Sequence, residues 1–323
     1  MTLQLLKYKE KLEQELENFF KRKKELSITL EEKEIITIIE DYTLRGGKRL
    51  RAYLQHLITT GLGGEDDLRA GMAMELLQSF FLIHDDIIDK DDYRRGGETP
   101  HFTYRKNYKQ LIPANDNEHI SNSLAILAGD LAFSYSNELM SKVSAKANIV
   151  MNKVSQTVII GQKRDTLSAY KEYDEKEILE NYRLKTASYT FLAPMRIGSI
   201  IAGQDIDFSK ISENLGIAFQ IQDDLLDYYG SEELGKPNFS DLKEGKKTII
   251  LARAKDIEYI QESIGKDDVD KEKIKELLLP IKEDLEKDVE NRYEKAMGDI
   301  NNLNITTKEE IIGLIKNLQG RKK

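Results

Sequence analysis

Apolar residues recur at helical spacing along most of this chain. In residues 4–23 their spacing is that of an amphipathic helix packed on one side. The apolar positions there are Leu5, Tyr8, Leu12, Leu16, Phe19 and Phe20. No stretch alternates apolar and polar residues for long enough to indicate a strand, so the pattern predicts an all-α fold with no sheet of consequence.

Capping signals predict where several helices begin and end. Thr29 with Glu32, and Asp174 with Glu177, form capping boxes. The first opens a helix to about Tyr42, and Asp66 is expected to begin the next long helix after the glycines at 61–64. Further helices are expected from Ser121, over 147–169, over 208–229 and through much of 246–323. Residues 96–118 hold turn formers without a period and are expected to form a loop.

Composition narrows the class of protein. The chain has 323 residues, 40% of them hydrophobic, and a net charge of −8, which does not favour nucleic-acid binding. Without cysteine, thiolate catalysis and disulfides are excluded, which fits a reducing cytoplasm. The N-terminal residues are interrupted by charge and lack a secretory signal. No apolar run approaches the ~20 residues of a membrane span. We therefore expect a cytoplasmic protein with no transmembrane segment.

Three aspartates interrupt the apolar helix that ends near residue 90. Asp85 and Asp89 lie one turn apart on one face, with Asp92 expected a further turn along. Asp86 lies about 100° away, where it is better placed behind the ligands than among them. Burying unpaired carboxylates costs several kcal/mol, so a cation is expected. Oxygen ligands alone suit Mg²⁺.

The same pattern returns at Asp223, Asp224 and Asp227. Phenylalanine stands four residues before the first aspartate in both copies, and isoleucine two before. Two exposed acidic patches would be the alternative, but that interpretation leaves the surrounding apolar residues unexplained. If both clusters serve one site, the chain forms one domain over residues 1–323.

Two further segments carry polar groups that suit anion binding. The run Arg45–Arg51 places two glycines and four basic residues at a helix start, where backbone N–H groups attract anions. A plain basic helix start is the alternative. Lys185 and Thr186 lie within an apolar helix, where a snorkelling lysine and a satisfied hydroxyl are the simpler interpretation.

Taken together, these motifs resemble those of the trans-type polyprenyl synthetases, the head-to-tail isoprenyl diphosphate synthases, over nearly the full chain. The matching segments are GGKRLR at 46–51, DDIID with RRG at 85–96, AILAGD at 125–130, GQ at 161–162, KT at 185–186, FQIQDDLLD at 219–227 and GKP at 235–237. The resemblance implies antiparallel helices around a deep central cavity, the isoprenoid synthase type I fold, usually as a homodimer.

The family's reaction joins an allylic diphosphate to isopentenyl diphosphate through an allylic carbocation, with Mg²⁺ between the carboxylates and the diphosphate. The displaced diphosphate itself is thought to take the proton. By the resemblance, Asp85 and Asp89 bind Mg²⁺ from one cluster, and Asp223, with Asp227 through water, binds it from the other. Asp86 and Asp224 complete the two predicted metal clusters. The allylic diphosphate is expected on Arg94, Lys185 and Lys236, and isopentenyl diphosphate on Lys48, Arg51, Gln78 and Arg95. Thr186 and Gln220 match polar groups beside the reacting carbons.

Product length is expected to depend on Phe80 and Phe81, one turn before Asp85. Large rings there would close the cavity early, which favours farnesyl diphosphate, with geranylgeranyl diphosphate next. The alternative is that both rings are ordinary core contacts. A longer-chain synthase and a non-catalytic regulatory subunit stay open. DDLLD argues against a terpene cyclase.

The chain departs from the family pattern at two places. Ala52 stands where proline is usual, and the segment after RRG is longer and more acidic than usual. Arg321, Lys322 and Lys323 could fold over the diphosphate, the alternative being a frayed terminus.

Overall fold

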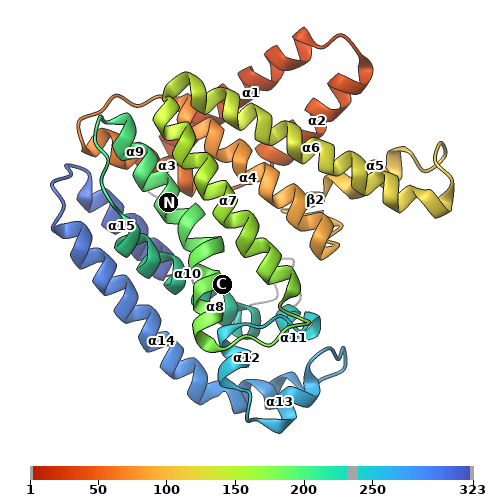
Figure 1. Ribbon diagram of the computed structural model, residues 1–323, viewed down its shortest axis with the longest axis vertical. Helices are drawn as coiled ribbons and strands as arrows, with labels where there is room; N and C mark the ends of the chain where they lie inside the picture. Colours follow the sequence, from red (N-terminus) through yellow and green to blue (C-terminus); the bar gives the residue numbers. More distant parts are fainter. Residues whose placement is uncertain (1–2, 231–238, 321–323) are drawn as a thin grey trace. The chain divides into compact units, whose positions relative to one another are not determined.

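The computed structural model describes residues 3–230 and 239–320 (Figure 1). Within these ranges the regular structure is helical apart from a two-strand hairpin, which confirms the all-α prediction. The elements are α1 (Leu3–Leu26), α2 (Leu30–Leu44), α3 (Leu50–Gly61), α4 (Leu68–Asp89), β1 (Tyr93–Arg94), β2 (Gly97–Glu98), α5 (Pro100–Asn107), α6 (Ala114–Val143), α7 (Ala145–Leu167), α8 (Glu175–Tyr182), η1 (Arg183–Leu192), α9 (Ala193–Ile201), α10 (Ser209–Tyr229), α11 (Ser240–Glu244), α12 (Ile249–Arg253), α13 (Glu258–Ser263), α14 (Lys271–Asn301) and α15 (Lys308–Gln319).

The chain folds into two compact units that are discontinuous in sequence. Unit 1 comprises Met1–His56 and Glu65–Asn148, and unit 2 comprises Leu57–Gly64 and Ile149–Lys323. The first aspartate cluster lies in unit 1 and the second in unit 2. That the whole chain acts as one domain stays a prediction. Among the described helices, none is both long enough and apolar enough to cross a bilayer.

In unit 1, α4 packs along α6, with α1 and α2 against the same helix (Figure 1). Gly129 on α6 leaves room for the His84 ring of α4, because a Cβ there would lie 2.4 Å from Nε2 of His84. Ser136 Oγ on α6 donates a hydrogen bond to the Ala73 carbonyl at 2.7 Å. The small residues of α6 therefore serve close packing against the helix that carries Asp85.

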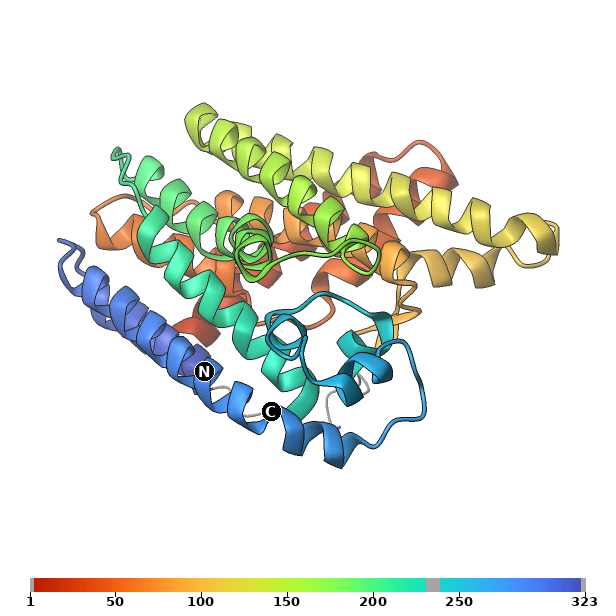
Figure 2. The same cartoon turned by 60° about the horizontal axis from the view of Figure 1, so that its bottom comes forward.

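In unit 2, α10 packs against both η1 and α14, and the two views show α14 in blue beside the teal α10 (Figures 1 and 2). A Cβ on Gly216 would lie 2.2 Å from Cα of Ala187, so only glycine allows this approach of α10 to η1. Helix α8 continues through η1 into α9 without a break. The element η1 is a π-helix, a wider turn that often marks a functional site.

Two local predictions were wrong. Residues 96–118 are not a loop, because Pro100 begins α5 and Pro113 precedes α6; the turn formers there act as helix starters. Asp92 does not continue the face of Asp85, because α4 ends at Asp89 and Lys90 has a left-handed backbone with φ 58°. Both capping boxes are confirmed. Helix α4 begins at Leu68 and is capped by Asp67, the residue after the expected Asp66.

Candidate active site

Helix α4 presents the first aspartate cluster from its last turn. Asp85 and Asp89 are half-buried, whereas Asp86 is fully buried. Asp86 accepts a hydrogen bond from the Tyr42 hydroxyl on Oδ2 and another from Arg94 Nε on Oδ1. Burial raises the pKa of Asp86 to about 6, against the opposing effect of Arg94. Both Asp86 oxygens are thus engaged by protein donors, which supports its placement behind Asp85 and Asp89.

Helix α10 repeats this arrangement in unit 2. Asp223 and Asp227 are half-buried and Asp224 is buried. Asp224 accepts hydrogen bonds from the Tyr182 hydroxyl and from Nε2 of Gln220, the latter at 3.0 Å. Burial raises the pKa of Asp224 well above its ordinary value. In each cluster a tyrosine from another helix orients the central aspartate.

Asp227 is held by the segment that begins α11. Its carboxylate accepts from the Ser240 hydroxyl at 2.6 Å and from the backbone N–H groups of Ser240 and Asp241 at 3.1 Å each. Burial and the nearby Asp227 raise the pKa of Asp241 to about 7. No sequence pattern singled out Asp241, Tyr42 or Tyr182 as site residues. Tyr42 and Tyr182 lie 44 and 42 residues before their aspartates, a similar offset in the two copies.

The π-helix η1 carries Thr186, which is hydrogen-bonded through Gln220 to the second aspartate cluster. Thr186 Oγ1 donates to Oε1 of Gln220 at 2.7 Å, and Gln220 in turn donates to Asp224. Lys185 Nζ lies 2.7 Å from Oδ2 of Asp165. Thr186 and Gln220, which the sequence places in different segments, therefore form one hydrogen-bonded chain.

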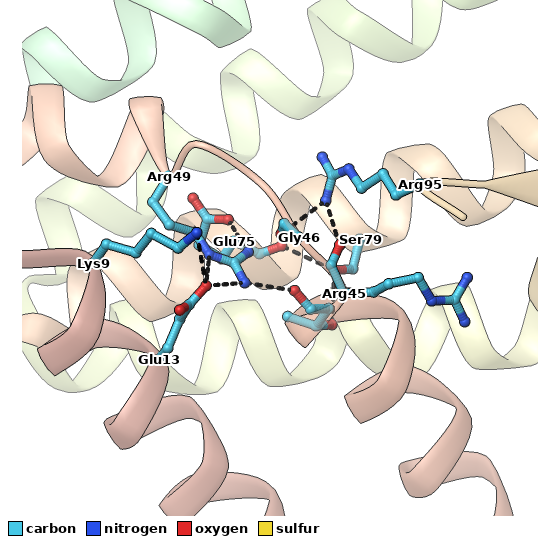
Figure 3. A network of polar contacts seen from close by, with 9 residues as sticks. Lys9, Glu13, Arg45, Gly46, Arg49, Glu75, Ser79 and Arg95 are labelled. Carbon is cyan, nitrogen blue, oxygen red and sulfur yellow. Dashed lines mark hydrogen bonds and ion pairs between the residues drawn. The ribbon is translucent and has the colours of Figure 1, made fainter. Parts of the chain in front are cut away.

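The basic run at 45–51 divides into exposed and buried members. Lys48 is exposed and Arg51 half-buried, but only 3% of Arg49 is exposed. Arg49 donates to Glu75 at 2.7 Å and to Glu13 at 3.0 Å, so it joins α1 to α4 (Figure 3). Arg49 is a structural cation, while Lys48 and Arg51 stay candidates for substrate binding.

The remaining predicted side chains lie around the same elements or outside the described residues. Gln78 is half-buried on α4, seven residues before Asp85. Arg94 and Arg95 occupy the β1–β2 hairpin, where Arg94 bonds to Asp86. Lys236 and the tail residues Arg321, Lys322 and Lys323 lie outside the residues that the structure describes.

The two rings before Asp85 differ in their surroundings. Phe80 is 8% exposed and packs against Phe133 of α6 and His84, with ring centroids 4.9 and 4.8 Å away. Phe81 is less buried and tilts against Phe80 at 4.9 Å. Phe80 thus contacts α6 and Phe81 is the less buried of the two; both stay candidates for limiting product length, Phe81 being the more accessible one.

The aspartates fit Mg²⁺ better than a metal held by protein ligands alone. Among the described residues, no three histidine, aspartate or glutamate side chains converge on one point. Mg²⁺ in enzymes is commonly bound by one or two carboxylates together with substrate phosphates and water. Asp85 with Asp89, and Asp223 with Asp227, provide that kind of partial ligand set.

Comparison with known proteins identifies the family. The model of the polyprenyl synthetase family matches residues 32–280, a stretch that runs through both units. The chain belongs to the polyprenyl synthetase family. It is a trans-prenyltransferase enzyme, as the motifs predicted.

Individual members of the family are similar over much of their length. The short chain isoprenyl diphosphate synthase of Methanocaldococcus jannaschii is 34% identical over 261 residues, 75% of this chain and 74% of that protein. The geranylgeranyl diphosphate synthase of Sulfolobus acidocaldarius is 38% identical over 224 residues, 64% of this chain and 63% of that protein. Geranylfarnesyl diphosphate synthases are also among the relatives.

A solved structure extends the similarity to the fold. It is geranylgeranyl pyrophosphate synthase from Corynebacterium glutamicum, complexed with isoprenyl diphosphate and magnesium. Its TM-score is 0.86 at 27% identity, with 98% of this chain and 99% of that chain covered. The all-α isoprenoid synthase fold expected from the motifs is confirmed.

Proposed function

We propose that this polyprenyl synthetase condenses an allylic diphosphate with isopentenyl diphosphate in a Mg²⁺-dependent reaction. The observation that carries the proposal is the doubled aspartate cluster. In each copy a buried central aspartate is held by a tyrosine hydroxyl, with two half-buried aspartates flanking it. Because protein donors already hold the central carboxylate, the flanking carboxylates are the ones proposed to meet the cation. Each cluster would act on a substrate diphosphate through Mg²⁺.

The chain's own residues divide the work of binding and stabilisation. Asp85, Asp89 and Asp223 would hold Mg²⁺, which when bound neutralises the diphosphate and favours its departure. Asp227, whose two oxygens accept hydrogen bonds from Ser240 and Asp241, would reach the metal through a water. Arg94, Lys185 and Lys236 hold the allylic diphosphate by charge-assisted hydrogen bonds. Lys48, Arg51, Gln78 and Arg95 hold isopentenyl diphosphate.

Two neutral groups would stabilise the allylic cation. Gln220 is oriented by its bond to the buried Asp224 and by the Thr186 hydroxyl. Its carbonyl oxygen and the Thr186 oxygen carry partial negative charge without a basic site that would remove a proton early. A fixed dipole of this kind needs no reorganisation as the cation forms.

Farnesyl diphosphate is the proposed main product, because Phe81 stands one turn before Asp85 and is less buried than Phe80. Geranylgeranyl diphosphate is the second candidate, which the names of several relatives favour. A cytoplasmic location is part of the proposal, because both substrates are charged diphosphates that do not cross a bilayer unaided.

A homodimer is also proposed. Helix α6 exposes Ile126 and Leu127, and α7 separately exposes Ile149, Ile159 and Ile160, each at 43% or more of its surface. Exposed branched residues repeated along a helix favour a protein partner over solvent. Sedimentation equilibrium at micromolar concentration tests this, and a monomer would contradict it.

The function is tested by incubating the chain with isopentenyl diphosphate, an allylic primer and Mg²⁺. Chromatography of the dephosphorylated products should show farnesol first and geranylgeraniol next. No condensation product would refute the proposal and favour a regulatory subunit. Products longer than geranylfarnesyl would instead indicate a long-chain synthase.

A further inference from the structure

We propose that Arg45 is a positioning residue that sets the geometry of both diphosphate-binding segments of unit 1. These segments are the glycine loop, residues 45–49, and the RRG hairpin, residues 93–98. The inference rests on the proposed function, because that function assigns substrate contacts to Lys48 in the loop and to Arg94 and Arg95 in the hairpin. Arg45 itself need not touch either substrate.

The Arg45 guanidinium links helix α2 to the backbone of the hairpin. Nη1 donates to the Glu98 carbonyl at 2.8 Å and to the Arg94 carbonyl at 3.3 Å. Nη2 forms an ion pair with Asp41, one turn earlier on α2. The planar guanidinium reaches all three acceptors from two separate nitrogens held in one plane, whereas a lysine has a single donor nitrogen. The hairpin strand ends are thus fixed to the end of α2.

Gly97 provides an independent observation for this contact. A Cβ on Gly97 would lie 2.3 Å from Cζ of Arg45 and 2.4 Å from its Nε, closer than any real Cβ contact. The backbone of Gly97 does not have the positive φ that favours glycine, unlike that of Gly96 at 74°. The missing side chain, rather than backbone freedom, is therefore what Gly97 contributes, and it makes room for the Arg45 guanidinium.

The hairpin also contacts the glycine loop, through Arg95. Arg95 Nη1 approaches the carbonyl oxygens of Arg45 and Gly46 at 3.4 and 3.5 Å, and its side chain points at this backbone in Figure 3. The two segments consequently hold each other through paired arginine-to-carbonyl contacts. Displacing Arg45 should therefore misplace Arg94, Arg95 and Lys48 together, which affects both substrates.

The kinetic test uses Arg45→Gln, Gly97→Ala and the double variant. Each single variant should raise the Michaelis constants for both diphosphates about tenfold, the effect of losing a charge-assisted hydrogen bond, with a smaller change in kcat. Because both substitutions disrupt the same contact between Arg45 and the hairpin, the double variant should have Michaelis constants no higher than those of either single variant. The matched controls are Arg69→Gln, at an arginine paired with Asp67 at the start of its own helix, and Gly313→Ala, with open space around the glycine.

Two readouts separate positioning from a general loss of structure. Arg45 lines a cavity of about 420 Å³ with Tyr42, Glu98 and Thr103, so ethylguanidinium can reach the gap left in Arg45→Ala. The added cation should restore the Michaelis constants of that variant and leave Lys48→Ala unchanged. Hydrogen exchange of the amides at 93–99 should quicken in Arg45→Gln without any substrate, while the melting temperature changes little.

The outcomes also distinguish this inference from the proposed function. Wild-type Michaelis constants in Arg45→Gln, additive losses in the double variant, or unchanged exchange at 93–99 would each overturn the positioning role. An inactive wild-type chain whose hairpin exchange still depends on Arg45 would refute the proposed function alone. It would leave the link between the loop and the hairpin standing.

Discussion

Tyr182 donates its hydroxyl hydrogen to Oδ2 of the buried Asp224. The backbone N–H of Ile249 donates to the same tyrosine oxygen at 2.9 Å, so the hydroxyl hydrogen is directed at the carboxylate. Tyr42 makes the equivalent contact with Oδ2 of Asp86 in the other unit. The repeat seen in the sequence thus extends to residues outside the repeated motif, and it orients the aspartate at the centre of each cluster.

Tyr182→Phe and Tyr42→Phe should each weaken an aspartate cluster without abolishing folding. Losing one donor to a buried carboxylate costs about 1–3 kcal/mol, because the oxygen is left without its hydrogen bond. We expect a lower melting temperature and a several-fold higher Mg²⁺ concentration for half-maximal activity. Tyr170→Phe, at a tyrosine that is 89% exposed, is the control. Unchanged Mg²⁺ dependence in both variants would contradict the orienting role.

Removing the metal or one of its proposed ligands should stop catalysis. Asp85→Ala and Asp223→Ala should each lower kcat by roughly 10³-fold, about 4 kcal/mol of transition-state stabilisation, with folding unchanged by circular dichroism. Asp116→Ala, at an exposed aspartate of α6, should retain activity. Turnover close to normal in excess EDTA would show that the clusters do not serve a divalent cation.

The two diphosphate sites should separate in steady-state kinetics. Lys48→Ala or Arg51→Ala should raise the Michaelis constant for isopentenyl diphosphate about tenfold or more, with little change for the allylic primer. Lys236→Ala should do the reverse. The experiment varies one substrate while the other is saturating. Equal effects on both constants would mean that the cations are wrongly divided between the substrates.

Product length should respond more cleanly to Phe81 than to Phe80. Phe81→Ala should lengthen the main product by at least one isoprene unit, because it removes the less buried ring. Phe80→Ala removes a buried contact with Phe133 and should cost about 3–5 kcal/mol of stability as well. Product chromatography and thermal unfolding are measured on both. An unchanged product from Phe81→Ala would place the limit of the cavity elsewhere.

His101 should make stability depend on pH. It is 1% exposed, and burial together with Arg105 lowers its pKa. As pH falls, His101 therefore binds a proton in the unfolded chain before it does so in the folded chain. Its contribution to the free energy of unfolding is full above the unfolded pKa of about 6.5 and is lost as pH falls through the lower folded pKa. The free energy of unfolding, measured with urea between pH 7.5 and 5, should fall less steeply with falling pH in His101→Gln than in the wild type. Replacement of the exposed His119 should leave the slope as in the wild type.

Sequence patterns alone determined the fold class and singled out the two aspartate clusters. Helical periodicity and capping boxes are local properties, so the helices at Leu30–Leu44 and Glu175–Tyr182 could be predicted from nearby residues. Carboxylates in apolar helices are costly to bury wherever the helices lie, so Asp85 and Asp223 stood out without coordinates. The expected loop at 96–118 failed because proline and threonine signal a turn and a helix start equally well.

Tertiary structure decided which partner each of these residues has. Tyr42 and Tyr182 lie more than 40 residues before the aspartates that they contact, and Asp241 follows the second motif. The sequence around a helical hydroxyl or carboxyl group does not indicate which residue it will contact. Packing likewise separated buried Arg49 from exposed Lys48, and Phe80 from Phe81, although each pair is adjacent in sequence. Adjacent residues on a helix or in a turn point in different directions, and the positions of the surrounding helices decide which of them is buried.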